Sequence, residues 1–122
     1  MEGIVSKRVL LVDDEPALRT AVGRMLRVLG YEALMASDGE EALALFKAER
    51  DAVAFVLLDL SLPRVGGREV FQALRAVKPG VPVLFSSGYE CPTELLADPA
   101  VKFVRKPYAL TELRGMVEKI TA

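Results

Sequence analysis

The sequence has no histidine, a single cysteine and no long apolar run, and each of these absences excludes a class of protein. A zinc site needs histidine or several cysteine ligands, so zinc enzymes are excluded. The one cysteine, Cys91, cannot form a disulfide within the chain, which agrees with a reducing compartment. A membrane-spanning helix needs ~20 consecutive apolar residues, and no segment approaches that length. We therefore expect no membrane insertion.

An excess of positive charge is also missing. The 16 lysines and arginines are balanced by 17 aspartates and glutamates, which gives a formal net charge of −1. Nucleic-acid binding depends mainly on attraction between basic side chains and phosphates, so we expect no direct binding to nucleic acid. Residues 1–7 lack the apolar stretch of a secretion signal, and we expect a cytoplasmic location.

What the sequence does contain is typical of a soluble globular protein. Its 122 residues are enough for one hydrophobic core, and a second functional module does not fit. Hydrophobic residues make up 52% of the chain and charged residues 27%, which are ordinary proportions for such a protein. We therefore expect residues 1–122 to form a single domain.

Short apolar runs alternate with segments of helical periodicity five times along the chain. This pattern predicts an α/β fold, in which a parallel sheet is covered by helices on both faces. The first and third runs are the most apolar, which is typical of central strands buried on both sides, so these two strands are expected to be neighbours. The predicted strands are residues 8–12, 32–36, 54–58, 81–86 and Val101–Arg105.

Three of the five predicted helices have clear start or stop signals, and the fourth is the poorest. The last helix offers only Ala109 at the position where a capping side chain would help, so its first turn is expected to fray. Pro16 lies near the start of the first helix and Gly30 ends it. The second helix follows Ser37 and Asp38, the third covers residues 68–78 and the last covers residues 110–120. Between Pro92 and Pro99 there is room for at most two helical turns, so the fourth helix is expected to be short.

Polar residues gather where the predicted strands end. Asp13 and Asp14 follow the first strand, Asp59 follows the third, the serines at 86 and 87 close the fourth, and Lys106 follows the fifth. The carboxyl ends of parallel strands share one edge of the sheet, which is where open α/β sheets bind ligands. We expect these residues to converge in one cleft.

A cluster of three carboxylates requires a cation, because neighbouring negative charges repel one another. Mg²⁺ prefers oxygen ligands, keeps several waters and suits a site that has few carboxylates and a phosphate. The sequence therefore predicts Mg²⁺ and metal-assisted phosphoryl chemistry at this edge of the sheet.

Four short motifs, each at a strand end, resemble the receiver domains of bacterial two-component response regulators. The resemblance covers nearly the whole chain, and it implies a three-layer, doubly wound, flavodoxin-like fold with strand order 2-1-3-4-5. That order places Asp13 and Asp14 beside Asp59, as the burial pattern of the strands also requires. The motifs are Val12-Asp13-Asp14-Glu15, Leu58-Asp59-Leu60-Ser61-Leu62-Pro63, Ser87-Gly88 and Lys106-Pro107-Tyr108.

The resemblance also implies a role for each carboxylate. Asp59 is expected to attack the phosphorus of a phosphohistidine on a sensor histidine kinase or phosphotransfer domain, forming an aspartyl phosphate. Asp14 and Asp59 are expected to bind Mg²⁺ directly, and Asp13 through water. The backbone carbonyl of Ser61 is expected to supply a further ligand.

The remaining motif residues are expected to couple phosphorylation to a conformational change. By resemblance, Lys106 neutralises charge on the transferring group, Ser87 binds a phosphoryl oxygen, Phe103 is the switch aromatic and Pro107 follows a cis bond. Considered alone, Phe103 would be read as an ordinary core residue. The change is expected to signal to a downstream protein or an attached domain, since the chain ends just after the fifth helix and carries no output domain.

The sequence departs from the usual receiver pattern in the segment between Ser87 and Lys106, which is shorter than usual. This shortness, together with Ser87-Gly88-Tyr89, resembles the receivers attached to hybrid sensor kinases.

Two other classes share some of these features. A haloacid-dehalogenase phosphatase also uses a strand-end aspartate and Mg²⁺, but Ser61 stands where that class needs a second aspartate, so turnover would be slow. A flavodoxin-like or nucleotide-binding module would need a glycine-rich loop after the first strand, and Asp13-Asp14-Glu15 would repel an unaccompanied phosphate there.

Overall fold

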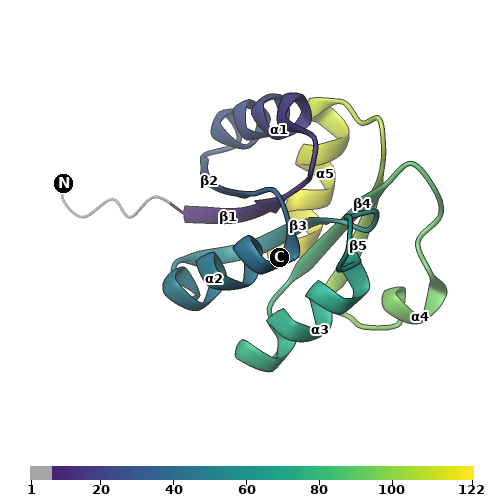
Figure 1. The fold of residues 1–122 in the computed structure, drawn as a ribbon. Coiled ribbons are helices and arrows are strands. Elements are labelled where there is room, and N and C mark those ends of the chain that lie inside the picture. The colour runs from purple at the N-terminus through teal and green to yellow at the C-terminus, as the bar shows by residue number, and fades with distance from the viewer. Residues whose placement is uncertain (1–6) are drawn as a thin grey trace.

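The structure is a computed structural model that describes residues 7–122, in which five parallel strands alternate with five helices (Figure 1). The sheet order is β2-β1-β3-β4-β5, as expected for the doubly wound fold. Most of the segment in which a secretion signal was sought lies outside the described residues. The elements are β1 (Lys7–Val12), α1 (Pro16–Val28), β2 (Tyr31–Ala36), α2 (Gly39–Glu49), β3 (Val53–Asp59), α3 (Gly67–Val77), β4 (Val83–Ser87), α4 (Thr93–Leu96), β5 (Val101–Arg105) and α5 (Leu110–Thr121).

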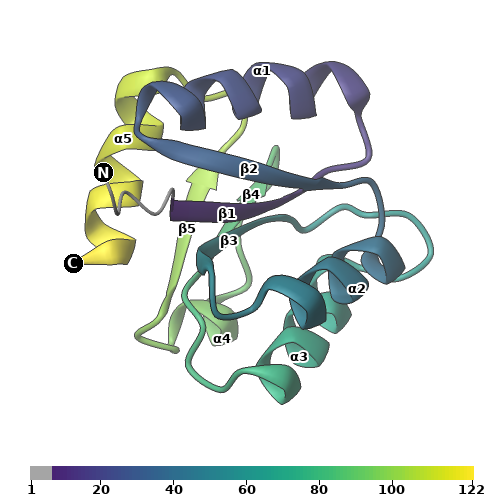
Figure 2. The ribbon, with the colours of Figure 1, turned by 90° about the vertical axis from the view of Figure 1, so that its left-hand side faces the viewer.

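The helices form the two outer layers of the fold (Figure 2). Side chains from α1 and α5, such as Leu26 and Leu113, pack on one face of the sheet in a buried cluster with Phe55. On the other face, α2, α3 and α4 contribute to a second cluster that includes Phe46 and Leu74. The prediction of a sheet covered on both faces is confirmed.

β1 and β3 are neighbours at the centre of the sheet, as their apolar sequences predicted. Their register pairs Leu10 with Val56 and Val12 with Leu58, and all four side chains are buried. Because both faces of these strands are covered, neither strand alternates between apolar and polar residues. Parallel pairing also ends both strands at the same edge of the sheet.

The boundaries of β4 differ from the predicted range of 81–86. The strand begins at Val83, because Pro82 has no N–H to donate to a ladder, although its carbonyl still accepts a hydrogen bond from the N–H of Val56. At its other end the strand continues to Ser87, whose carbonyl accepts from the N–H of Lys106 at 2.8 Å. Ser87 is thus held by the sheet itself.

The helix signals in the sequence are largely confirmed. Asp38 caps α2 by accepting from the N–H of Glu41, and Gly30 follows α1 with a φ of 96°, a value that favours glycine. α5 lacks a capping side chain at Ala109, as expected, but the Glu112 carboxylate accepts the N–H of Ala109 at 2.9 Å. A side chain of the first turn therefore accepts the N–H that precedes the helix.

The fourth helix is a single turn of four residues, Thr93–Leu96, so the prediction of a shortened helix is confirmed. Across residues 7–122, no helix combines the length and the apolar character that crossing a membrane requires.

Candidate functional site

The three carboxylates predicted to cluster do come together at the carboxyl edge of the sheet. Asp13 and Asp14 follow β1, Asp59 ends β3, and one carboxylate oxygen from each lies within 4.8 Å of the other two. Asp13 and Asp59 are buried, whereas Asp14 is exposed. The cluster therefore has a buried floor and one side that is open to solvent.

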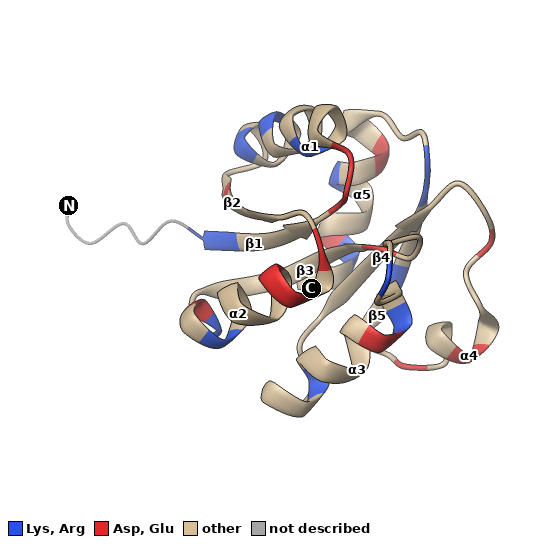
Figure 3. Cartoon of the chain, in the orientation of Figure 1, with Lys and Arg blue, Asp and Glu red and all other residues tan. Residues whose placement is uncertain are grey.

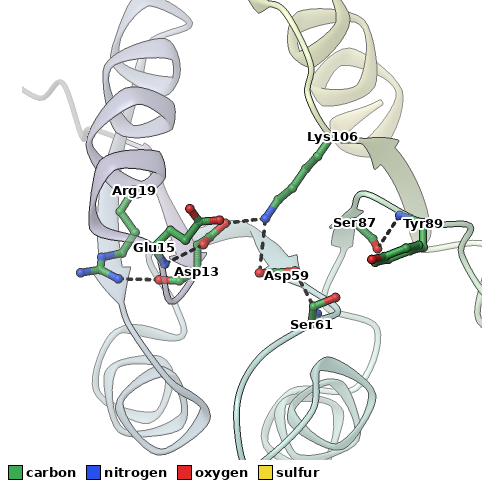
Figure 4. Close-up of polar contacts among 8 residues, drawn as sticks. All are labelled: Asp13, Glu15, Arg19, Asp59, Ser61, Ser87, Tyr89 and Lys106. Atoms are coloured by element: carbon green, nitrogen blue, oxygen red, sulfur yellow. Dashed lines mark hydrogen bonds and ion pairs between the residues drawn. The ribbon is translucent and has the colours of Figure 1, made fainter.

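Every polar group of Asp13 has a partner, and Figure 4 shows its contacts with Glu15, Arg19 and Lys106. Its N–H donates to the carbonyl of Ala36 at 3.1 Å, and its Oδ1 accepts from the N–H of Glu15 at 2.9 Å. Its Oδ2 accepts from Lys106 Nζ at 2.8 Å, and its carbonyl oxygen accepts from Arg19 Nη1 at 2.6 Å. The residue is fixed at both its backbone and its carboxylate.

Asp59 is only 4% exposed, and its two carboxylate oxygens have different partners. Oδ1 accepts from the N–H of Ser61 at 2.9 Å, and Oδ2 lies 3.3 Å from Lys106 Nζ. The following residue, Leu60, donates its N–H to the carbonyl of Ser86 at 3.0 Å, which ties the end of β3 to β4. The carboxylate is therefore presented at a fixed position at the sheet edge.

Lys106 links Asp13 and Asp59 by contacting both carboxylates (Figure 4). Partial burial acts to lower the pKa of Lys106, but the hydrogen bond to Asp13 and the nearby charge of Asp59 outweigh it and raise the pKa. The ammonium group is thus held in its charged form. The peptide bond between Lys106 and Pro107 is cis, as the resemblance implied.

Tyr108 follows the cis proline, and no separate role was predicted for it. Its ring packs among the residues of the α1 and α5 face. Burial raises the pKa of Tyr108 well above its ordinary value, and the charges of Asp13 and Asp59 act in the same direction. Its hydroxyl therefore stays protonated.

Gly67, the first residue of α3, is required by its closeness to Asp59. A Cβ atom at this position would lie 2.6 Å from the Asp59 carbonyl oxygen and 2.7 Å from the Cα of Leu60. Both of these atoms belong to the backbone and cannot rotate away. The start of α3 can pack against the end of β3 only because residue 67 has no side chain.

Ser87 lies at the same edge but has no bond to the carboxylates among residues 7–122. Its buried Oγ accepts from the N–H of Tyr89 at 3.0 Å, and the Tyr89 side chain is 77% exposed (Figure 4). Phe103 on β5 is partly buried against the α2 and α3 cluster. The roles predicted for Ser87, Phe103 and the Ser61 carbonyl stay predictions.

Charged pairs join the short α4 to α3. Arg75 Nη1 lies 2.6 Å from Asp98 Oδ2, just after α4, and its guanidinium lies 4.8 Å from the centre of the Phe71 ring. Arg68 and Glu94 form a more exposed pair at 2.7 Å. Figure 3 shows residues of both charges along α3 and acidic residues around α4.

The donor set suits a small, hard divalent cation. Three carboxylates can supply oxygen ligands, the exposed position of Asp14 leaves room for water, and Lys106 supplies only one positive charge against three negative ones. Mg²⁺ prefers such oxygen ligands and keeps several of its waters. The residues therefore fit the ion that the sequence predicted.

The comparison with protein families gives a match over nearly the whole chain. Residues 9–118 match the model of the response regulator receiver domain. The response regulator MprA of Mycolicibacterium vanbaalenii is 38% identical over 110 residues, which are 87% of this chain and 46% of that protein. The probable transcriptional regulatory protein TcrX of Mycobacterium tuberculosis is 35% identical over 86% of this chain and 45% of its own length. The chain spans about half the length of these relatives.

Solved structures resemble the whole fold. The receiver domain of the hybrid histidine kinase CckA has a TM-score of 0.81 and 33% identity, covering 94% of this chain and 99% of its own. The receiver domain of a Pseudomonas aeruginosa sensor histidine kinase, with magnesium coordinated in its active-site cleft, has a TM-score of 0.82 and 26% identity. That match covers 95% of this chain and 98% of the other.

Proposed function

The chain belongs to the family of response regulator receiver domains, and on this premise we propose that Asp59 is its phosphoacceptor. The phosphoryl group comes from a phosphohistidine on a sensor histidine kinase or a phosphotransfer domain. The observation that carries the proposal is the position of Asp59, which is buried, bonded to Lys106 and clustered with two further carboxylates. The alternative of a haloacid-dehalogenase phosphatase finds no support in the family match.

In the reaction, a carboxylate oxygen of Asp59 forms a bond to phosphorus while the bond from phosphorus to the donor imidazole breaks. The buried floor of the site holds the Asp59 carboxylate in a fixed direction, so little orientation has to be achieved during the reaction. Lys106 Nζ lies 3.3 Å from that carboxylate, beside the place that the phosphoryl oxygens must occupy. Its charge stabilises those oxygens as they arrive.

Asp13, Asp14, Asp59 and the Ser61 carbonyl would hold Mg²⁺, which neutralises the negative charge that gathers when a phosphoryl group approaches three carboxylates. The Pseudomonas relative with magnesium in its cleft supports this assignment. Ser61 offers no carboxylate two residues after Asp59, so the chain lacks the group that would rapidly activate water. The domain therefore assists its own phosphorylation and loses the phosphate slowly.

The phosphorylated domain signals through Ser87, Phe103 and the segment that follows Ser87. A phosphate on Asp59 can shift a conformational equilibrium only through contacts that differ between two states. The Ser87 hydroxyl accepts one hydrogen bond from Tyr89, and a rotation that offers its proton to a phosphoryl oxygen costs only that bond. The conformational change is passed on to a downstream protein or an attached domain.

The proposal is tested by labelling the chain with radioactive acetyl phosphate in the presence and absence of Mg²⁺. We expect about one label for each chain, dependent on Mg²⁺ and absent from Asp59→Asn, because an amide is a far poorer nucleophile than a carboxylate. Asp51→Asn is the matched control, since Asp51 is exposed just before the other end of β3. Label that survives on Asp59→Asn would refute the assignment, and rapid release of many phosphates for each parent chain, without accumulation of label, would favour a phosphatase.

A further inference from the structure

Arg19 stands out because it lies partly buried on α1 and donates a 2.6 Å hydrogen bond from Nη1 to the carbonyl oxygen of Asp13. The helix holds Arg19 in place through its own backbone, since its N–H donates to the Glu15 carbonyl at 3.0 Å. Figure 4 shows the guanidinium reaching back toward Asp13, on the side away from Lys106. The side chain therefore closes a short loop over residues 13–15.

The carbonyl that Arg19 binds belongs to the peptide unit between Asp13 and Asp14. A peptide unit is planar, so fixing its oxygen also fixes the direction in which the chain enters Asp14. The other groups of Asp13 are held by Ala36, Glu15 and Lys106, but Asp14 is exposed. Asp14 therefore takes its direction from the backbone on either side of it, and Arg19 holds the peptide unit that precedes it.

We propose that Arg19 is a positioning residue for the metal site, which sets the direction of the Asp14 carboxylate through the carbonyl of Asp13. The inference rests on the proposed function, because it takes Asp14 to be a ligand of Mg²⁺. Groups that orient metal ligands without touching the metal typically change its affinity 10-fold to 100-fold when they are lost. Arg19 orients Asp14 in this way, by binding the backbone carbonyl that precedes it rather than its carboxylate.

If Arg19 acted only through its positive charge, its loss would change the Mg²⁺ affinity in the opposite direction. The direction of the change in Mg²⁺ affinity therefore tests the inference. Arg19 binds the backbone carbonyl of a residue in the carboxylate cluster, and a cation near that cluster repels Mg²⁺. Removing the charge alone would therefore tighten Mg²⁺ binding. Losing the hydrogen bond to Asp13 would instead weaken it. A simple loss of folding stability would change neither the affinity nor the stoichiometry of the molecules that stay folded.

The experiment measures Mg²⁺ binding by isothermal titration calorimetry at a temperature where circular dichroism shows each variant to be folded. Arg19→Met keeps the apolar stem and removes both charge and donor. We expect this variant to bind Mg²⁺ about tenfold more weakly than the parent. Arg24→Met, at an exposed position on the same helix, removes one charge without touching Asp13 and should bind at least as tightly as the parent.

Two further variants test whether Arg19 changes the Mg²⁺ affinity through Asp14. Arg19→Lys keeps a charged donor and should recover part of the lost affinity, although the charge alone would oppose binding. The double variant Arg19→Met/Asp14→Ala should bind no more weakly than Asp14→Ala, because Arg19 acts through Asp14 and the two losses then overlap. If Arg19→Met does not fold at the assay temperature, Arg19→Gln, which is neutral and shorter, is expected to give the same loss.

Binding by a neutral Arg19 variant that equals or exceeds the affinity of the parent would overturn the inference, and so would fully additive losses in the double variant. Failure of the parent chain itself to bind Mg²⁺ is a separate result. It would refute the metal site of the proposed function rather than the role of Arg19.

Discussion

The two ends of the candidate site are held to very different degrees. At the acid end, which comprises Asp13, Asp59 and Lys106, each buried carboxylate has bonds to both of its oxygens. At the serine end, which comprises Ser87–Tyr89 and α4, the Ser87 hydroxyl has one bond and α4 is a single turn. The acid end is therefore assembled before any ligand arrives, and the serine end is the part that can change at low cost.

Removing the lysine of the acid end tests this comparison most strongly. Lys106→Ala leaves Asp13 and Asp59 close together without their cation, and we expect a loss of about 3 kcal/mol in unfolding free energy. Mg²⁺ should restore more stability to this variant than to the parent, because it replaces the missing charge. Urea denaturation with and without Mg²⁺ measures both effects.

Lys102→Ala is the control for that experiment, since Lys102 lies on β5, just before Lys106, and forms no ion pair with Asp13 or Asp59. Equal gains from Mg²⁺ in the parent and in Lys106→Ala would show that Lys106 does not balance the charge of the cluster.

The close packing beneath the acid end is tested by Gly67→Ala. The added Cβ would approach two backbone atoms of Asp59 and Leu60 to within 2.7 Å, so the start of α3 must shift, at a cost of about 2 kcal/mol. Gly66→Ala is the control, because a Cβ there meets only the Glu69 carboxylate at 3.9 Å. Similar midpoints of thermal unfolding for the two variants would contradict the steric argument.

The link between α3 and the serine end is tested by Asp98→Asn. The Arg75 hydrogen bond and then the Ala100 N–H lower the pKa of Asp98 below its ordinary value of 3.8. A lowered pKa in the folded state adds stability that is complete above that ordinary value and is lost as the pH falls through the folded-state pKa. We expect Asp98→Asn to cost about 1 kcal/mol at pH 7, because the pair is partly exposed.

The difference in unfolding free energy between the parent and Asp98→Asn should shrink as the pH falls below about 4. A difference that stays constant down to that range would show that the carboxylate charge is not what ties α4 to α3.

A substitution at the serine end is expected to give the smallest loss of unfolding free energy. Ser87→Ala removes one hydrogen bond, from the N–H of an exposed residue that can bind water instead, so the cost is about 0.5 kcal/mol. Mg²⁺ affinity should stay at the value of the parent, because Ser87 has no bond to the carboxylates in the described part of the chain. A marked change in Mg²⁺ affinity would mean that the two ends are coupled before phosphorylation.

Most of the fold could be predicted because the residue pattern of each segment agrees with the place of that segment in the sheet or in the helical layers. Apolar runs without alternation placed β1 and β3 at the centre of the sheet, and Pro92 and Pro99 limited α4 to at most two turns, of which the structure forms one. The start of β4 was wrong by two residues, since apolar character alone does not show that Pro82 cannot donate to the ladder. Such boundaries depend on hydrogen bonds rather than on hydrophobicity.

The site residues that lie at the carboxyl ends of strands could be predicted from the sequence. Asp13, Asp14, Asp59 and Lys106 follow or end strands of one parallel sheet, so topology alone brings them together. Arg19 could not be found in this way, because its position on a helix gives no sign that its side chain reaches back to a carbonyl. A helix cap such as Asp38 follows a known sequence pattern, whereas a contact from within a helix to a carbonyl outside it does not.

The exposure of Tyr89 also gives the molecule an optical probe. The chain has three tyrosines and no tryptophan, so energy transfer to an indole does not obscure tyrosine emission. Within residues 7–122, Tyr31 and Tyr108 are partly buried against the cluster that contains Phe55, whereas Tyr89, two residues after Ser87, is 77% exposed. Quenching by a soluble agent such as iodide should therefore act mainly on Tyr89. Time-resolved emission could then follow the serine end during phosphorylation without an attached dye.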